Sequence, residues 1–325
     1  MRVRPFWMVV VIMVSLSLAV LPTFAQEKLS EKDVQKLMEE AEKKVNDDKP
    51  AEAIEDYRSI VKDYPDNGEV QLKLGELLRA SEQWTSAATA FKRASDHLTG
   101  PDQGKAYEGL TIALTKDAKY EQAVEAGQKA LDANPTSAST LVNLAFSLSK
   151  TGKLQEAADT ARKALDLEHN SAIANATLGE ALLADGKFDE AEASFGKALG
   201  IEKDNAEALA GMADIYLRKE SYDQAIESAT QALEFNDKLT RAYAIRGMAQ
   251  NAKGDTSAAY SDLSMAVTVN PNDPDAQFAF AKVYEKQGNA GMAATAYNKA
   301  LELNPNLSDA YWPLVTIDRK STRLN

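Results

Sequence analysis

Few side chains in this sequence are suited to acid-base or nucleophilic chemistry. The 325 residues include only two histidines, His97 and His169, and no cysteine. Both histidines stand where a helix is expected to end, so a role in a turn or helix terminus is favoured over proton transfer. The lack of cysteine excludes thiol catalysis and thiolate metal sites.

Short motifs of enzymes are missing as well. The sequence has no His-Glu-x-x-His, no Gly-rich phosphate loop and no Gly-x-Ser-x-Gly. Carboxylates such as Asp189 with Glu190, or Asp255 near Asp262, are expected to be solvated faces or helix N-caps. The segment 270–275 lacks the ligand spacing of a calcium loop and is expected to be a turn followed by an N-cap. We therefore expect no enzymatic activity, no cofactor and no metal.

The charge of the chain limits the kinds of partner. The formal net charge is −12, and no basic stripe is present that could neutralise phosphates. Nucleic acid and anionic membrane surfaces are therefore not expected partners. Basic or neutral proteins remain compatible with this charge.

Two amphipathic helices can be recognised in residues 172–205. The first carries Leu178 and Leu182 on one face and is expected to end at Gly186 in a left-handed conformation. The second carries Phe195 on its apolar face. Neither helix could bury its apolar stripe alone, so the unit needs neighbours of its own kind.

The sequence supplies these neighbours through a repeat of 34 residues. One alanine recurs at this spacing, with a single excess of two residues; its eight copies are Ala53, Ala87, Ala123, Ala157, Ala191, Ala225, Ala259 and Ala293. Small residues, with one isoleucine, also recur seven positions after and twelve positions before each alanine. We expect these to be the places where helices approach closely.

The pattern resembles the tetratricopeptide repeat. The residues that carry the resemblance are Leu178-Gly179, Leu182, Ala191, Phe195 and Ala198, with matching sets at Leu74-Gly75, Leu78, Ala87, Phe91 and Ala94 and at Phe280-Ala281, Tyr284, Ala293, Tyr297, Ala300 and Pro305. The resemblance extends from about Val34 to Leu307. It implies an all-α, right-handed superhelical solenoid of about eight helix-turn-helix units.

This spacing predicts the organisation of the chain. The expected units are residues 34–67, 68–103, 104–137, 138–171, 172–205, 206–239, 240–273 and 274–307. Residues 308–318 are expected to begin a further repeat or cap. Residues 319–325 have no periodicity and resemble translated adapter sequence, so we expect the native chain to be longer.

The N-terminus is predicted to be an export signal. Arg2 and Arg4 precede the apolar run Phe6–Val20, and small residues lead to Ala25. We expect a signal peptide at residues 1–25, cleavage after Ala25, a charged and loose leader at 26–33, and a periplasmic or extracellular protein without stable membrane insertion. An uncleaved membrane anchor is the alternative.

The two extra residues lie in segment 97–103, which contains a Gly-Pro break. We interpret them as a lengthened second helix or turn of the second unit. A ligand-contacting loop is the alternative.

The resemblance implies that the first helices of successive units line a concave face that binds extended or helical peptide segments. On this basis the groove comprises Val142, Asn143, Phe146, Ala176, Glu180, Asp214, Arg218, Arg241, Met248, Asn251, Phe278 and Lys282. Its middle is expected to be small and apolar, formed by Ala176, Ala210 and Ala244. The Lys/Asn clamp that some family members use for a C-terminal carboxylate is absent.

Two functions from different classes fit these features. The first is an exported, non-catalytic scaffold or adaptor that binds protein or peptide partners in the groove. The second is the repeat region of a larger, C-terminally truncated exported enzyme, such as a peptidase or polysaccharide-processing protein. Self-association through Tyr311 and Trp312 is a further hypothesis.

Overall fold

The computed structural model describes residues 28–305, 307 and 310–316. These residues form helices and short turns, with no strand among them. The helices are α1 (Glu31–Asn46), α2 (Pro50–Asp63), α3 (Gly68–Ala80), α4 (Trp84–His97), α5 (Gly100–Lys116), α6 (Tyr120–Ala133), α7 (Ala138–Lys150), α8 (Leu154–Leu167), α9 (Ala172–Ala184), α10 (Phe188–Ile201), α11 (Ala206–Arg218), α12 (Tyr222–Phe235), α13 (Thr240–Lys253), α14 (Thr256–Val269), α15 (Pro274–Lys286) and α16 (Ala290–Leu303). The predicted all-α fold is confirmed.

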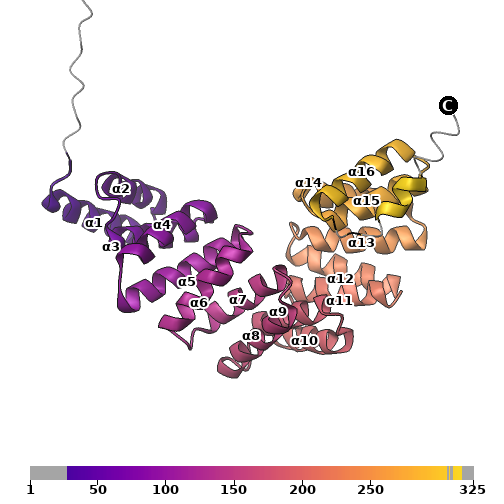
Figure 1. Ribbon diagram of the computed structural model, residues 1–325, viewed down its shortest axis with the longest axis horizontal. Helices are drawn as coiled ribbons and strands as arrows, with labels where there is room; N and C mark the ends of the chain where they lie inside the picture. Colours follow the sequence, from indigo (N-terminus) through magenta and orange to yellow (C-terminus); the bar gives the residue numbers. More distant parts are fainter. Residues whose placement is uncertain (1–27, 306, 308–309, 317–325) are drawn as a thin grey trace, which may run out of the picture.

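The helices form a right-handed solenoid of helix-turn-helix units. Each helix packs mainly on the one before and the one after it, and the stack bends into an arc with α8–α10 at the bend (Figure 1). The first helices α3, α5, α7, α9, α11, α13 and α15 also contact one another in succession. Among the described residues the second helices show no comparable succession. The first helices therefore line the inner, concave side of the arc.

Small residues allow the helices to approach closely, as predicted from the repeat. The eight alanines at the 34-residue spacing, from Ala53 to Ala293, have no accessible surface. The residues seven positions later, from Ile60 to Ala300, are at most 2% exposed. Any larger side chain at these positions would have to displace a neighbouring helix.

Aromatic rings fill the space between units where glycines leave room. Phe195 of α10 has no accessible surface and lies against Gly179 of α9 and Gly211 of α11. A Cβ atom added at Gly179 would come within 2.7 Å of this ring, and one at Gly211 within 2.3 Å. Phe91 lies between Gly75 and Gly109 in the same way. These glycines are therefore needed for close packing.

The Gly211→Ala variant tests this packing. Alanine favours helix by about 1 kcal/mol over glycine, but the new methyl group would overlap Phe195, so we expect a net loss of about 1–3 kcal/mol in the free energy of unfolding. The matched control is Gly196→Ala in α10, where nothing lies within 4 Å of the added Cβ. This control should stabilise the protein. If urea denaturation showed the same increase in the free energy of unfolding for both variants, the close contact between Gly211 and Phe195 would be contradicted.

The two extra residues lie in a different place from the one predicted. Helix α4 has 14 residues, like the other second helices, whereas α5 has 17 and begins at Gly100. The interpretation as a lengthened second helix or turn is therefore wrong. Pro101 is accepted because it occupies the first turn of α5, where its missing N–H has no partner to lose.

The described part of the leader is also more ordered than expected. The backbone N–H of Leu29 donates to Asp63 at 2.9 Å, and the hydroxyl of Tyr64 donates to the carbonyl of Leu29. Ser30 and Asp33 form a capping box that starts α1. The expectation of a loose segment is wrong for residues 28–33.

Several sequence predictions fall partly or wholly outside the described residues. These concern the signal peptide at 1–25, leader residues 26–27 and the tail at 319–325. Of the predicted further repeat at 308–318, residues 311–316 are helical. Within the described part of the chain, no helix combines the length and the apolar character needed to cross a membrane.

Candidate functional site

The concave face carries a charged network that joins three consecutive units. Arg241, at the start of α13, donates to both carboxylate oxygens of Glu180 in α9 and, at 2.9 Å, to Asp214 in α11. Arg218, at the end of α11, donates to the other oxygen of Asp214 at 2.8 Å. The first helices position these groups because each presents the same face to the inside of the arc. Glu180 and Arg241, 61 residues apart in sequence, thus become direct partners.

The network stabilises the charge of Arg241. Burial opposes the charge, but the carboxylates of Glu180 and Asp214 more than offset this effect, so the pKa of Arg241 is raised. Its side chain remains 28% exposed because the concave face is open to water. The carboxylates of Glu180 and Asp214 are 17% and 16% exposed. Charged side chains that are partly buried and held by several hydrogen bonds keep a fixed geometry.

Two further carboxylates on this face were missed by the sequence analysis. Glu207 and Asp275 stand one repeat before and one repeat after Arg241, so the spacing of 34 residues could have identified both. Burial inside the groove and the nearby charge of Glu180 raise the pKa of Glu207. Burial, with Asp273 and Asp214, raises the pKa of Asp275. Both residues are nevertheless exposed to solvent.

The raised pKa of Glu207 predicts a pH-dependent stability. Ionised Glu207 is less favourable in the folded chain than in the unfolded chain, so its charge lowers stability above the folded pKa and has no effect below the unfolded pKa. We expect Glu207→Gln to raise the free energy of unfolding at pH 7 by less than about 1 kcal/mol, since solvent screens the exposed part. The gain should vanish as the pH falls to about 4. Denaturant titrations at several pH values measure this; a gain that grows on acidification would contradict it.

Apolar side chains flank the network at both ends. The ring centroids of Phe278 in α15 and Tyr297 lie 5.6 Å apart. The ammonium of Lys282 lies 4.6 Å from the ring centroid of Phe278. At the other end Lys150 lies 5.0 Å from the ring of Phe146. Phe278 and Phe146 are both half-buried. A partner could therefore contact an aromatic group beside a cation at either end.

The structure does not make all twelve predicted groove residues accessible. Val142 and Ala176 are only 9% and 4% exposed and belong to the hydrophobic core. Ala210 and Ala244 are buried as well, at 0% and 4%. The predicted small apolar mid-groove is therefore wrong: these side chains pack helix against helix. The remaining ten residues are half-buried or exposed: Asn143, Phe146, Glu180, Asp214, Arg218, Arg241, Met248, Asn251, Phe278 and Lys282.

One acidic residue has a different role from the one predicted. Asp255 is the N-cap of α14, as expected, but Asp262 is buried and 6% exposed. Its two oxygens accept from Arg246 at 2.7 Å each, and Arg246 also donates to Thr230. The expectation of a solvated face or cap is wrong for Asp262. The predicted N-cap after segment 270–272 is confirmed at Asp273.

The two histidines, the remaining candidates for acid-base chemistry, lie at helix ends and make structural contacts there. His97 ends α4 beside Asp66 at 3.2 Å, and His169 contacts the carbonyl of Leu165 at the end of α8. Across residues 28–305, 307 and 310–316 no group of three His, Asp or Glu side chains is placed to hold a metal ion. What the arrangement offers is a concave surface with fixed charges and accessible aromatic groups. Such a surface fits a protein-interaction solenoid.

Comparisons with known proteins define the family. Models described as tetratricopeptide repeat match residues 39–97, 72–138, 142–206, 182–249 and 274–307. These matches span well over half of the chain. The protein therefore belongs to the tetratricopeptide repeat family. No curated protein matches it.

Solved structures are similar in fold. The APC/C hetero-tetramer Cut9–Hcn1 aligns with a TM-score of 0.63 at 18% identity, over 82% of this chain and 52% of that one. This chain thus spans about half the length of that relative. A tetratricopeptide repeat protein from Parabacteroides merdae ATCC 43184 aligns with a TM-score of 0.53 at 16% identity, over 88% and 99% of the two chains. A monomeric mutant of IFIT1 with m7Gppp-AAAA gives 0.58 at 16%, over 85% and 70%.

Proposed function

We propose that this protein is an exported, non-catalytic scaffold that binds a peptide segment of a partner protein on its concave face. The observation that carries the proposal is the charged network of Glu180, Asp214 and Arg241, which lies on the inner side of the solenoid. Membership of the tetratricopeptide repeat family supports protein binding as the general role.

The two unpaired carboxylates on this face favour basic side chains in the bound segment, although Lys150 and Lys282 lie beside the aromatic rings at its ends. Arg218 and Arg241 are already engaged by Glu180 and Asp214. Glu207 and Asp275 form no ion pair with a described residue, and burial together with neighbouring carboxylates raises the pKa of both. A lysine or arginine of a partner would supply the missing opposite charge. Met248 and Phe278 on the same face would give such a segment apolar contacts.

Peptide binding to the full mature chain tests this function. Fluorescein-labelled peptides that combine lysines with an aromatic residue should bind, and we expect the double variant Glu207→Lys/Asp275→Lys to weaken them by about tenfold or more. The matched control is Glu227→Lys/Glu234→Lys, which makes the same charge change on exposed positions of α12. Phe278→Ala should also weaken binding. Equal losses for both double variants would show general charge attraction and would contradict the proposed site.

Export is proposed from the N-terminal sequence, with its basic start and apolar run. We expect the mature protein isolated from its source to begin at Gln26. Mass spectrometry of the N-terminal peptide, after separation of cytoplasm from the exported fraction, measures this. Recovery of residues 1–25 on the mature chain would contradict cleavage.

A further inference from the structure

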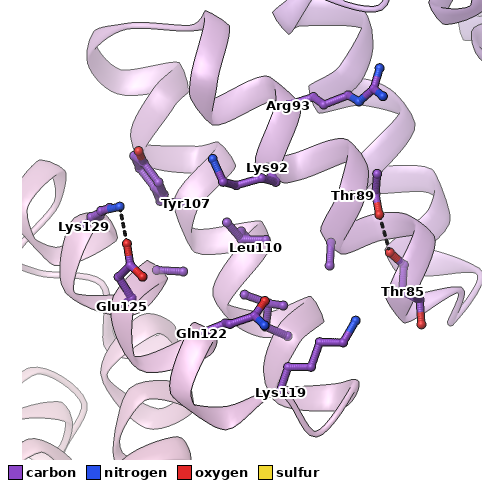
Figure 2. Close-up of a pocket in the computed structure, with 13 residues that line it drawn as sticks. Thr85, Thr89, Lys92, Arg93, Tyr107, Leu110, Lys119, Gln122, Glu125 and Lys129 are labelled. Carbon is purple, nitrogen blue, oxygen red and sulfur yellow. Dashed lines mark hydrogen bonds and ion pairs between the residues drawn. The ribbon is translucent and has the colours of Figure 1, made fainter.

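The outer side of the solenoid contains a cavity that the concave site does not use. Its volume is about 510 Å³, and it lies between the second helices α4 and α6, with α5 as its floor (Figure 2). This volume is within the range of roughly 300–1,000 Å³ that is usual for binding pockets. The cavity adjoins α5, the helix that contains the two extra residues.

The floor of the cavity is apolar. Leu110 and Leu114 of α5 are each 5% exposed, and Ala88 of α4 and Ala126 of α6 are 6% and 4% exposed. The small alanines on both walls leave the space above the leucines open. A leucine-sized or aromatic side chain of a partner could enter there and lose its contact with water.

The rim of the cavity is basic, in contrast to the chain as a whole. Four cations line it, Lys92, Arg93, Lys119 and Lys129, against one carboxylate, that of Glu125. The net charge of the whole chain is −12. Three of these cations are paired with carboxylates of the same chain, so one uncompensated positive charge remains, and it favours an acidic group of a partner at this position.

Arg93 is the cation that is free to bind such a partner. Lys92 is held by Asp96, Lys119 by Asp117 and Lys129 by Glu125. Arg93 is exposed and makes no ion pair with any described residue. Arg93 also lines a second cavity of about 340 Å³ on the other side of α4, so it lies between the two cavities. A guanidinium in this position can bind a carboxylate through two parallel hydrogen bonds.

We propose that this cavity is a second docking site, for an acidic amphipathic helix of a partner protein. An apolar side chain of the helix enters between α4 and α6, and a carboxylate on the next turn pairs with Arg93. Amphipathic helices generally bind grooves through side chains that lie about one helical turn apart. The site lies on the opposite side from the concave network, so the solenoid can hold two segments at once.

A synthetic helical peptide with leucines one turn apart and flanking glutamates is the probe. Its fluorescence anisotropy is measured with the full mature chain, together with a peptide in which lysines replace the glutamates. We expect the acidic peptide to bind and Arg93→Glu to weaken it by about tenfold or more. Thr89→Trp, at an exposed position on the cavity rim, should block binding without a change in the core.

The matched control is Lys163→Glu in α8, which stands two repeats after Arg93 at the same place in its unit and outside the cavity. This variant, and the concave variant Glu207→Lys/Asp275→Lys, should leave the affinity unchanged. Failure of the acidic peptide to bind, equal binding of the lysine peptide, or equal losses for Arg93→Glu and Lys163→Glu would each overturn the proposal. None of these results would affect the concave site.

Discussion

Replacing Asp262 by alanine is expected to lower the free energy of unfolding by about 3 kcal/mol. The substitution removes both hydrogen bonds to Arg246 and leaves this guanidinium largely buried without its opposite charge. The cost is at the lower end of the usual range because Arg246 keeps 20% of its side chain accessible and can turn partly toward water. Urea denaturation followed by circular dichroism measures the loss.

The double variant Arg246→Leu/Asp262→Ala is the control. In the second unit Leu74 and Ala90 occupy the places of Arg246 and Asp262, and in the third unit Leu110 and Ala126 do so. The double variant thus restores a packing that the repeat already uses, and we expect it to be as stable as the wild type or more so. If Asp262→Ala alone cost less than about 1 kcal/mol, the pair would behave as an exposed ion pair instead.

Replacing Phe195 by alanine should cost about 3–5 kcal/mol. The ring is fully buried between α9 and α11, and the glycines that face it, Gly179 and Gly211, cannot fill the space it leaves. Because each unit is supported mainly by its neighbours, the loss should appear first as faster hydrogen exchange in α9–α11.

Phe188→Ala provides the comparison on the same helix. Phe188 is 38% exposed and contacts the guanidinium of Arg218 at 5.5 Å. Its removal should cost no more than about 1 kcal/mol. Similar losses for the two phenylalanines would contradict the packing described for Phe195.

The fold was predictable because the repeat specifies it many times over. The alanines at 34-residue spacing, such as Ala191, mark the helix crossings, and Gly186 does adopt the positive φ expected at the end of its helix. The same backbone conformation at Glu220 and Ala118 carries no sequence signal, because neither residue favours it. The placement of the two extra residues in α5 was not predictable, since Gly-Pro fits a turn as well as a first helical turn.

The site was predictable only in part. The repeat register placed Glu180, Asp214 and Arg241 on one face, but their contact depends on how far the solenoid curves, which no local pattern encodes. The burial of Val142 depends on how closely neighbouring helices approach. The pairing of Asp262 with Arg246 was only half detectable: Arg246 departs from the apolar residues at its place in most units, whereas the place of Asp262 also holds Asp56 and Ser194.

Hydrogen–deuterium exchange of the full chain, with and without a bound basic peptide, tests the central claim most directly. If the concave face is the binding surface, protection should concentrate in the first helices α9, α11, α13 and α15, which carry Glu180, Asp214, Arg241 and Asp275. The second helices α10, α12 and α14 should change little. Protection confined to the second helices would contradict the assignment of the concave face as the binding surface.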